Sequence, residues 1–122
     1  KRVVFCSGKV YFDLFQGRET RGIQDVAIVR IEQLYPFPAD EYAAVLDRYP
    51  NAKDIVWCQE EPENQGALYQ VRHRLEAGLS PQHQFLYACR HRAASTAVGY
   101  HKVHVHQQEQ VVEAALTGGV AA

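Results

Sequence analysis

The chain has 122 residues, a formal net charge of −1 at pH 7, and 47% hydrophobic against 22% charged residues. This composition is typical of a globular domain and excludes collagen, coiled coil and disordered chains, while the length fits a single domain. Because 13 Lys and Arg residues face 14 Asp and Glu residues, no basic excess points to nucleic acid or to an anionic membrane surface. The longest apolar runs, about five or six residues, are far shorter than the roughly 20 residues that span a bilayer.

The sequence contains no methionine and begins Lys1-Arg2, without the charged region and apolar stretch of a signal peptide. We therefore expect the chain to be part of a longer protein. Its three cysteines, Cys6, Cys58 and Cys89, each end an apolar run and form no Cys-x-x-Cys motif. This pattern predicts reduced, buried thiols in a cytosolic type of protein rather than a disulfide.

Four short apolar runs, at residues 3–6, 26–31, 55–58 and 85–89, are nearly continuous rather than alternating. Strands that are covered on both faces show this pattern, as in a parallel sheet. The segments that follow the runs carry apolar residues at helical spacing. These positions are Val10, Tyr11, Leu14 and Phe15, then Tyr42, Val45, Leu46 and Tyr49, then Leu68, Val71 and Leu75, and finally Val111, Val112, Ala115 and Leu116.

Boundary residues agree with this alternation. Gly22 suits a left-handed cap at the end of the first helix, while Asn64 and Gly78 are predicted to begin and end the third. The order is therefore β-α-β-α-β-α-β-α, with a loop of about fifteen residues before the last helix. It predicts a three-layer α/β/α, doubly wound sheet in one domain, residues 1–117, followed by a flexible tail, residues 118–122.

Polar residues follow the predicted strands, and in an open parallel sheet ligands and partners meet the carboxyl ends of the strands. Ser7, Gly8 and Lys9 come directly after the first strand and open a helix, where backbone N–H groups could hold an anion. The glycine-rich run of a Walker loop is absent. The alternative is a tight turn in which the glycine permits close backbone approach, and the residues leave both interpretations open.

Two further groups have the residue types of a chemical site but not its spacing. Glu60 and Glu61 are adjacent, so in extended chain they point to opposite sides and do not form an acid–base pair. We expect one carboxylate to bond a backbone group or an arginine at an interface and the other to be solvated. His101, His104 and His106 would need one turn and then an extended pair to bind a metal, and no nearby cysteine or carboxylate completes the set. We expect a polar loop there, and no catalytic, cofactor-binding or metal-binding residue in this chain.

Three segments of the sequence carry a family resemblance. They are residues 6–14 (CSGKVYFDL), 25–38 (DVAIVRIEQLYPFP) and 57–67 (WCQEEPENQGA). With them the chain resembles the C-terminal domain, of the transketolase C-terminal type, of the thiamin diphosphate-dependent first component of 2-oxoglutarate dehydrogenase. The resemblance covers nearly the whole chain. It departs after the fourth strand, where Cys89 replaces a glycine and His91 and Thr96 replace prolines.

The resemblance implies four parallel strands in the order 2-1-3-4, with an antiparallel edge strand before Lys1 and so outside the chain. It also implies the reaction of a parent enzyme, a tricarboxylic acid cycle oxidoreductase that decarboxylates 2-oxoglutarate on thiamin diphosphate, with magnesium, and passes a succinyl group to a lipoyl arm. In this family the cofactor contacts lie in the two preceding domains. We therefore expect no cofactor in this chain and no activity of the chain alone. A close relative that acts on 2-oxoadipate is an alternative.

The resemblance gives the domain a role in assembly. Its expected partners are the preceding domains, the homodimer mate and the lipoyl-bearing second component of a multienzyme complex, in a bacterial cytoplasm or a mitochondrial matrix. The order 2-1-3-4 places a crevice between strands one and three. We expect the preceding domains or the dimer mate to dock there, and Glu60 to contact an arginine or a backbone N–H. The walls of the crevice are Ser7, Gly8, Lys9, Gln59, Glu60, Asn64 and Gln65. A free-standing module that binds a small anion or a nucleotide at this switch point is the alternative of a different class.

Overall fold

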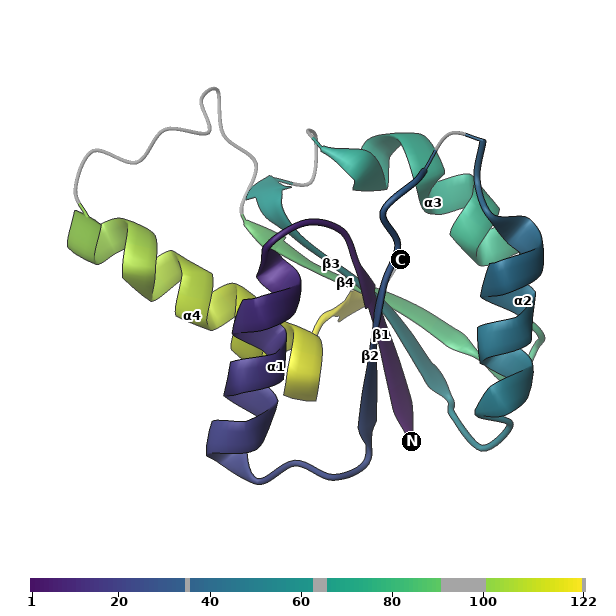
Figure 1. Cartoon of the computed structure of the whole chain (residues 1–122), viewed down its shortest axis with the longest axis horizontal. Helices are drawn as coiled ribbons and strands as arrows, with labels where there is room; N and C mark the ends of the chain where they lie inside the picture. The colour runs from purple at the N-terminus through teal and green to yellow at the C-terminus, as the bar shows by residue number, and fades with distance from the viewer. Residues whose placement is uncertain (35, 63–65, 91–100, 122) are drawn as a thin grey trace.

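The computed structural model describes residues 1–34, 36–62, 66–90 and 101–121, which form a twisted sheet between two layers of helices (Figure 1). The strands are β1 (Arg2–Cys6), β2 (Val26–Arg30), β3 (Asp54–Pro62), β4 (Gln84–Arg90) and β5 (Val120–Ala121), and the helices are α1 (Val10–Arg21), α2 (Ala39–Arg48), α3 (Ala67–Ala77) and α4 (His101–Thr117). Strands β1 to β4 are parallel and lie in the order 2-1-3-4, as predicted. No helix within the described ranges is both long and apolar enough to cross a membrane.

Strand β5 extends this sheet at its β4 edge and runs antiparallel to β4. The antiparallel strand that the resemblance implies before Lys1 lies outside this chain and stays a prediction, whereas β5 lies within residues 118–122, which were predicted to be a flexible tail. Gly119 has a φ of +107°, a backbone conformation that glycine adopts without strain, and it lies directly between α4 and β5. A strand of two residues is too short to leave a periodic signal in the sequence.

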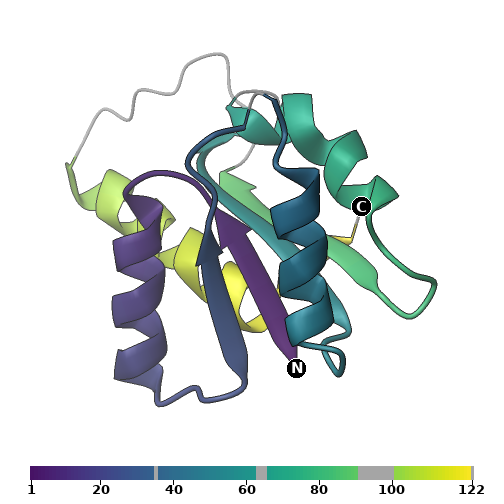
Figure 2. The ribbon, with the colours of Figure 1, turned by 45° about the vertical axis from the view of Figure 1, so that its right-hand side comes forward.

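Helices cover both faces of the sheet (Figure 2), and each helical layer encloses an apolar core. Helices α1 and α4 cover one face, where Leu14 and Leu116 are buried together with Val4 of β1. Helices α2 and α3 cover the other face, where Trp57 of β3 is fully buried. Fully burying a large apolar side chain contributes roughly 1.5–3 kcal/mol, so these two layers supply most of the driving force for folding. Phe15 was predicted on the buried face of α1, but its side chain is exposed.

Helix ends show which boundary signals were right. Gly22 caps α1 in the left-handed region, with a φ of +67°, as predicted. Gly78 ends α3 for a different reason, because its φ is an ordinary −85° and a Cβ there would lie 2.7 Å from Cε2 of Tyr42. The N-cap of α3 is Gly66 rather than Asn64, which lies outside the described residues.

Helix α4 begins at His101, so the expectation of a polar loop through His101, His104 and His106 was wrong. In a helix His101 and His104 share one face while His106 does not, because a turn takes 3.6 residues. The side chains of these histidines lie outside the described part of the structure, as do His91 and Thr96. The absence of a metal site at the histidines therefore stays a prediction.

Candidate functional site

The turn after β1 forms one side of the predicted crevice. Cys6 pairs in register with Cys58, so Ser7 leaves β1 at the level where β3 continues beyond Cys58 to Pro62. Gly8 has a φ of +81°, and no atom lies within 4 Å of the position that a Cβ would take. The glycine is thus needed for its backbone conformation and not for close approach, which corrects the sequence-based interpretation. Lys9 is exposed at the start of α1.

Gln59 supports the opposite wall from within and is not part of its surface. Its side chain is buried, and its Oε1 accepts hydrogen bonds from Trp57 Nε1 at 3.0 Å and from the backbone N–H of Leu68 at 2.8 Å. Its Nε2 donates to the carbonyl oxygen of Glu61 at 3.1 Å. The amide therefore ties the end of β3 to the first turn of α3. Gln59 was predicted in the wall of the crevice; the structure buries its side chain behind that wall, where β3 continues in place of the expected loop and the amide bonds to Trp57 and Leu68.

Glu60 joins a polar network that spans the crevice. Its Oε1 accepts a hydrogen bond from Gln108 Nε2 at 3.0 Å, and the same amide nitrogen donates to Asp13 Oδ2 at 2.9 Å. Arg90 Nη2 donates to Gln108 Oε1 at 2.9 Å. Gln108 of α4 consequently links α1, β3 and β4. Sequence reasoning missed it, because Gln108 lies in a glutamine-rich stretch that resembles an ordinary solvated helix face.

The two adjacent glutamates point to opposite sides, as predicted. Glu60 is half-buried on the face covered by α1 and α4. Glu61 is exposed on the α3 side, where its side chain would lie 3.0 Å from a Cβ placed on Gly66. These two carboxylates therefore do not cooperate as an acid and a base, and only Glu60 faces the crevice.

Two thiols lie beneath this network. Cys6 and Cys58 are fully buried side by side on β1 and β3. Burial raises the pKa of Cys6 to about 12, against a smaller opposing effect of Arg30, and burial also raises the pKa of Cys58. Both thiols are therefore protonated and poor nucleophiles at neutral pH. Cys89 is only half-buried, so the expectation of buried thiols is right for two of the three.

The described residues of the crevice do not suit a diphosphate with its magnesium ion. The carboxylates of Asp13 and Glu60 would repel a diphosphate, and both already accept hydrogen bonds from one amide. Within the described ranges no three His, Cys, Asp or Glu side chains lie close enough to hold a metal. Asn64 and Gln65, the remaining predicted wall residues, lie outside those ranges.

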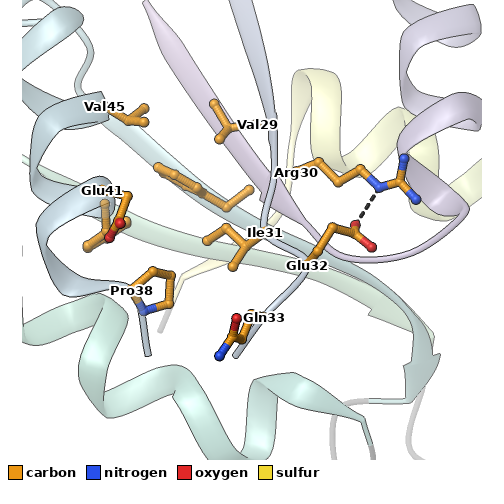
Figure 3. A pocket seen from close by; sticks show the side chains of 10 residues that line it. Val29, Arg30, Ile31, Glu32, Gln33, Pro38, Glu41 and Val45 are labelled. Carbon is orange, nitrogen blue, oxygen red and sulfur yellow. Dashed lines mark hydrogen bonds and ion pairs between the residues drawn. The ribbon is translucent and has the colours of Figure 1, made fainter. Parts of the chain in front are cut away.

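A second hollow, of about 310 Å³, lies between β2 and α2 (Figure 3). Its walls are largely apolar, with Val29 of β2 and Ile31, which follows β2, facing Val45 of α2. Arg30 and Glu32 form an ion pair that points away from α2, toward α1. Gln33 and Glu41 also line the hollow and add polar groups to its otherwise apolar wall.

Comparison with known proteins identifies the family. The family described as 2-oxoglutarate dehydrogenase C-terminal matches residues 1–116. The chain belongs to this family. The 2-oxoglutarate dehydrogenase E1 component of Haemophilus influenzae is 51% identical over 117 residues, which cover 96% of this chain and 12% of that protein. The E1 components of Cupriavidus necator and Azotobacter vinelandii are each 50% identical, over 94% and 96% of this chain and 12% and 13% of those proteins.

This family membership confirms the resemblance that the sequence segments carried. The chain spans only 12–13% of the length of these three relatives. Two of the resembling segments contribute the residues that the structure brings to the crevice, Ser7 to Lys9 from one and Glu60 from the other.

Proposed function

We propose that this chain is the C-terminal assembly domain of the first component of a 2-oxoglutarate dehydrogenase and is not catalytic by itself. The observation that carries the proposal is the family match over residues 1–116, together with relatives named E1 component at about half identity. The crevice supports it, because among its described residues the thiols are buried and protonated, Gln59 is bonded internally, and the Asp13 and Glu60 carboxylates share one amide.

The proposed role is to dock the larger part of the polypeptide at the carboxyl ends of β1 and β3. Ser7, Lys9 and Glu60 present polar groups at this edge of the sheet, and Gln108 holds the Glu60 carboxylate in place. A charged side chain fixed by a neighbour loses less conformational entropy on docking than a mobile one. We assign the central contact to Glu60, with an arginine or a backbone N–H of the neighbouring domain as its partner.

The parent reaction in this proposal is the decarboxylation of 2-oxoglutarate, with thiamin diphosphate and magnesium held by the domains that precede this one. The cofactor supplies the carbanion chemistry, and the partners are the homodimer mate and a lipoyl-bearing second component. The residues of this chain contribute to assembly and not to the choice between 2-oxoglutarate and 2-oxoadipate.

Two measurements test the proposal. The full-length protein, supplied with thiamin diphosphate, magnesium and either 2-oxoacid, should decarboxylate 2-oxoglutarate in preference to 2-oxoadipate. The 122-residue chain should release no heat when titrated with thiamin diphosphate and magnesium in a calorimeter. Saturable binding of the cofactor by the chain would contradict the non-catalytic role, and saturable binding of phosphate or a nucleotide would favour the free-standing module instead.

A further inference from the structure

The edge of the sheet at β2 carries an unusual amount of exposed aromatic surface. Among the described residues the large apolar side chains that stand exposed are Phe12 (59%), Phe15 (44%) and Tyr49 (37%). Phe12 and Phe15 come from α1, and Tyr49 follows the end of α2. All three flank β2, the strand at the edge of the sheet opposite β5. Single exposed apolar residues are common, but a contiguous group marks an interaction site.

Ring and guanidinium contacts join the α1 side of this group. Tyr11 lies with its ring centroid 5.4 Å from that of Phe12 and 6.5 Å from that of Phe15. The guanidinium of Arg30 lies 5.7 Å and 5.2 Å from the centroids of Tyr11 and Phe12, and that of Arg18 lies 5.0 Å from the centroid of Phe15. An arginine held over aromatic rings forms an ordered, amphipathic surface. Tyrosine and arginine are also enriched among the residues that contribute most of the binding energy in protein interfaces.

A shallow groove of about 420 Å³ continues this surface across β2 to the end of α2. Tyr11 and Arg30 line one side of the groove, and Arg48 and Tyr49 line the other. We call the whole area the aromatic–arginine surface. It consists of Tyr11, Phe12, Phe15, Arg18, Arg30, Arg48 and Tyr49.

The surface is continuous with the proposed docking crevice. Phe12 lies in the first turn of α1, three residues after Lys9, and its backbone N–H donates to the carbonyl oxygen of Lys9 at 3.1 Å. The next residue, Asp13, is bonded to Gln108 in the crevice network. A partner that meets the carboxyl ends of β1 and β3 therefore reaches the aromatic–arginine surface around the start of α1.

We propose that the aromatic–arginine surface is the main apolar contact for the part of the polypeptide that precedes this domain. The inference rests on the proposed function, since the relatives are proteins of which this chain matches only 12–13%. The surface holds three guanidinium groups, and Glu32 pairs with one of them. The part of the preceding polypeptide that covers this surface consequently presents apolar side chains to Phe12 and Phe15 and carboxylates to the arginines.

A second copy of the chain fits this surface less well. In a two-fold interface the same patch meets itself, so a patch with three guanidinium groups and the single carboxylate of Glu32 would face a second patch of the same net positive charge. An interface between domains of one chain typically buries 600–1,500 Å² and is partly polar, which suits a surface of rings and guanidinium groups. The preceding part of the same polypeptide is therefore the occupant to which the charge pattern points.

Thiol labelling of the full-length protein tests this assignment. Phe12→Cys and Gln82→Cys are each introduced singly; Gln82 is an exposed residue in the turn before β4 and serves as the matched control. We expect the thiol at position 12 to react at least about tenfold more slowly than the thiol at position 82 in the native protein, and at the same rate in urea. Site-resolved mass spectrometry separates these thiols from Cys6, Cys58 and Cys89.

Two outcomes would overturn the inference. Equal labelling at both positions in the native protein would mean that nothing covers the surface. Protection that is lost when a folded dimer is diluted to monomers would mean that a second copy covers it. Equal labelling in a protein that decarboxylates 2-oxoglutarate would contradict this inference alone. Protection of the thiol at position 12 in a protein without that activity would contradict only the proposed function. Phe15→Cys gives an independent readout on the same surface.

Discussion

Arg2 and Asp54 lie opposite each other on the parallel strands β1 and β3, with Arg2 Nη2 3.1 Å from Asp54 Oδ2. The Arg2 side chain is only 10% exposed, and its Nη1 donates to the carbonyl oxygens of Ala115 at 2.9 Å and Gly118 at 2.8 Å. The last carbonyl groups of a helix have no partner within the helix. One guanidinium therefore joins the start of the sheet to the end of α4.

Replacing this arginine should destabilise the domain. Arg2→Ala leaves the partly buried Asp54 carboxylate and the helix-end carbonyls unpaired, so we expect the free energy of unfolding to fall by about 2–4 kcal/mol. Urea denaturation of the 122-residue chain measures it. Arg74→Ala, at an exposed position of α3, is the control and should change the stability by less than about 0.5 kcal/mol. Equal effects of the two substitutions would contradict this role of Arg2.

The sheet was predictable because each parallel strand is a continuous apolar run and each helix carries an apolar stripe. Val3 to Cys6 are buried as the pattern requires, and the spacing of Leu68, Val71 and Leu75 gave the buried face of α3. The side-chain contacts that join the sheet to the end of α4 were not predictable in the same way. The local sequence at Lys1 and Arg2 is typical of two solvated charges, because no nearby residue indicates which helix end will lie over Arg2.

The structure brings several of the predicted crevice residues to one edge of the sheet and buries one of them, Gln59. Topology alone places the ends of β1 and β3 side by side, which brings Ser7 and Glu60 to one edge. Whether Gln59 faces solvent depends on how far β3 continues, and its hydrogen bonds go to Trp57 and Leu68. Contacts of this kind depend on packing against α3 and α4, which a periodic pattern does not encode.

The buried amide of Gln59 offers a second test of stability. Gln59→Ala removes the acceptor of two buried donors, Trp57 Nε1 and the Leu68 N–H, so we expect a loss of about 2–4 kcal/mol in the free energy of unfolding. Gln70→Ala, an exposed glutamine on α3, is the matched control. Thermal and urea unfolding of both variants measure the difference. A loss no larger than that of the control would show that water satisfies both donors.

Alkaline pH should weaken the fold through the buried groups whose pKa burial raises, which are Cys6, Cys58 and Tyr42. Burial raises the pKa of Cys6 from 9.0 to about 12 and also raises that of Tyr42, whose hydroxyl donates to the Leu75 carbonyl at 2.8 Å. A group whose pKa is higher in the folded state stabilises fully below its unfolded pKa and less as the pH rises. We expect the unfolding free energy to begin to fall above pH 9, by about 1.4 kcal/mol per pH unit for Cys6 alone.

Urea denaturation between pH 8 and pH 11 measures this decline. Cys6→Ala should lower the stability at pH 8, because it removes buried atoms, and should make the decline above pH 9 shallower. Tyr42→Phe should act in the same direction, with its effect beginning near pH 10, the ordinary pKa of tyrosine. An unchanged slope in both variants would show that other groups govern the alkaline transition.

Glu60→Ala separates docking from domain stability. In the isolated chain the change removes one hydrogen bond from Gln108, so we expect a loss of less than about 1 kcal/mol in the free energy of unfolding. In the full-length protein the docking partner of Glu60 would be left unpaired, at a cost of roughly 2–5 kcal/mol, so both assembly and 2-oxoglutarate decarboxylation should weaken.

Glu61→Ala, the exposed neighbour on the opposite side of β3, is the matched control in both contexts. Gln108→Ala completes the set, because it leaves the Glu60 carboxylate but removes its internal bond, together with the bonds of Gln108 to Asp13 and Arg90. If Glu60→Ala lowers the free energy of unfolding equally in the isolated chain and in the full-length protein, Glu60 acts only within its own domain and the docking role is wrong.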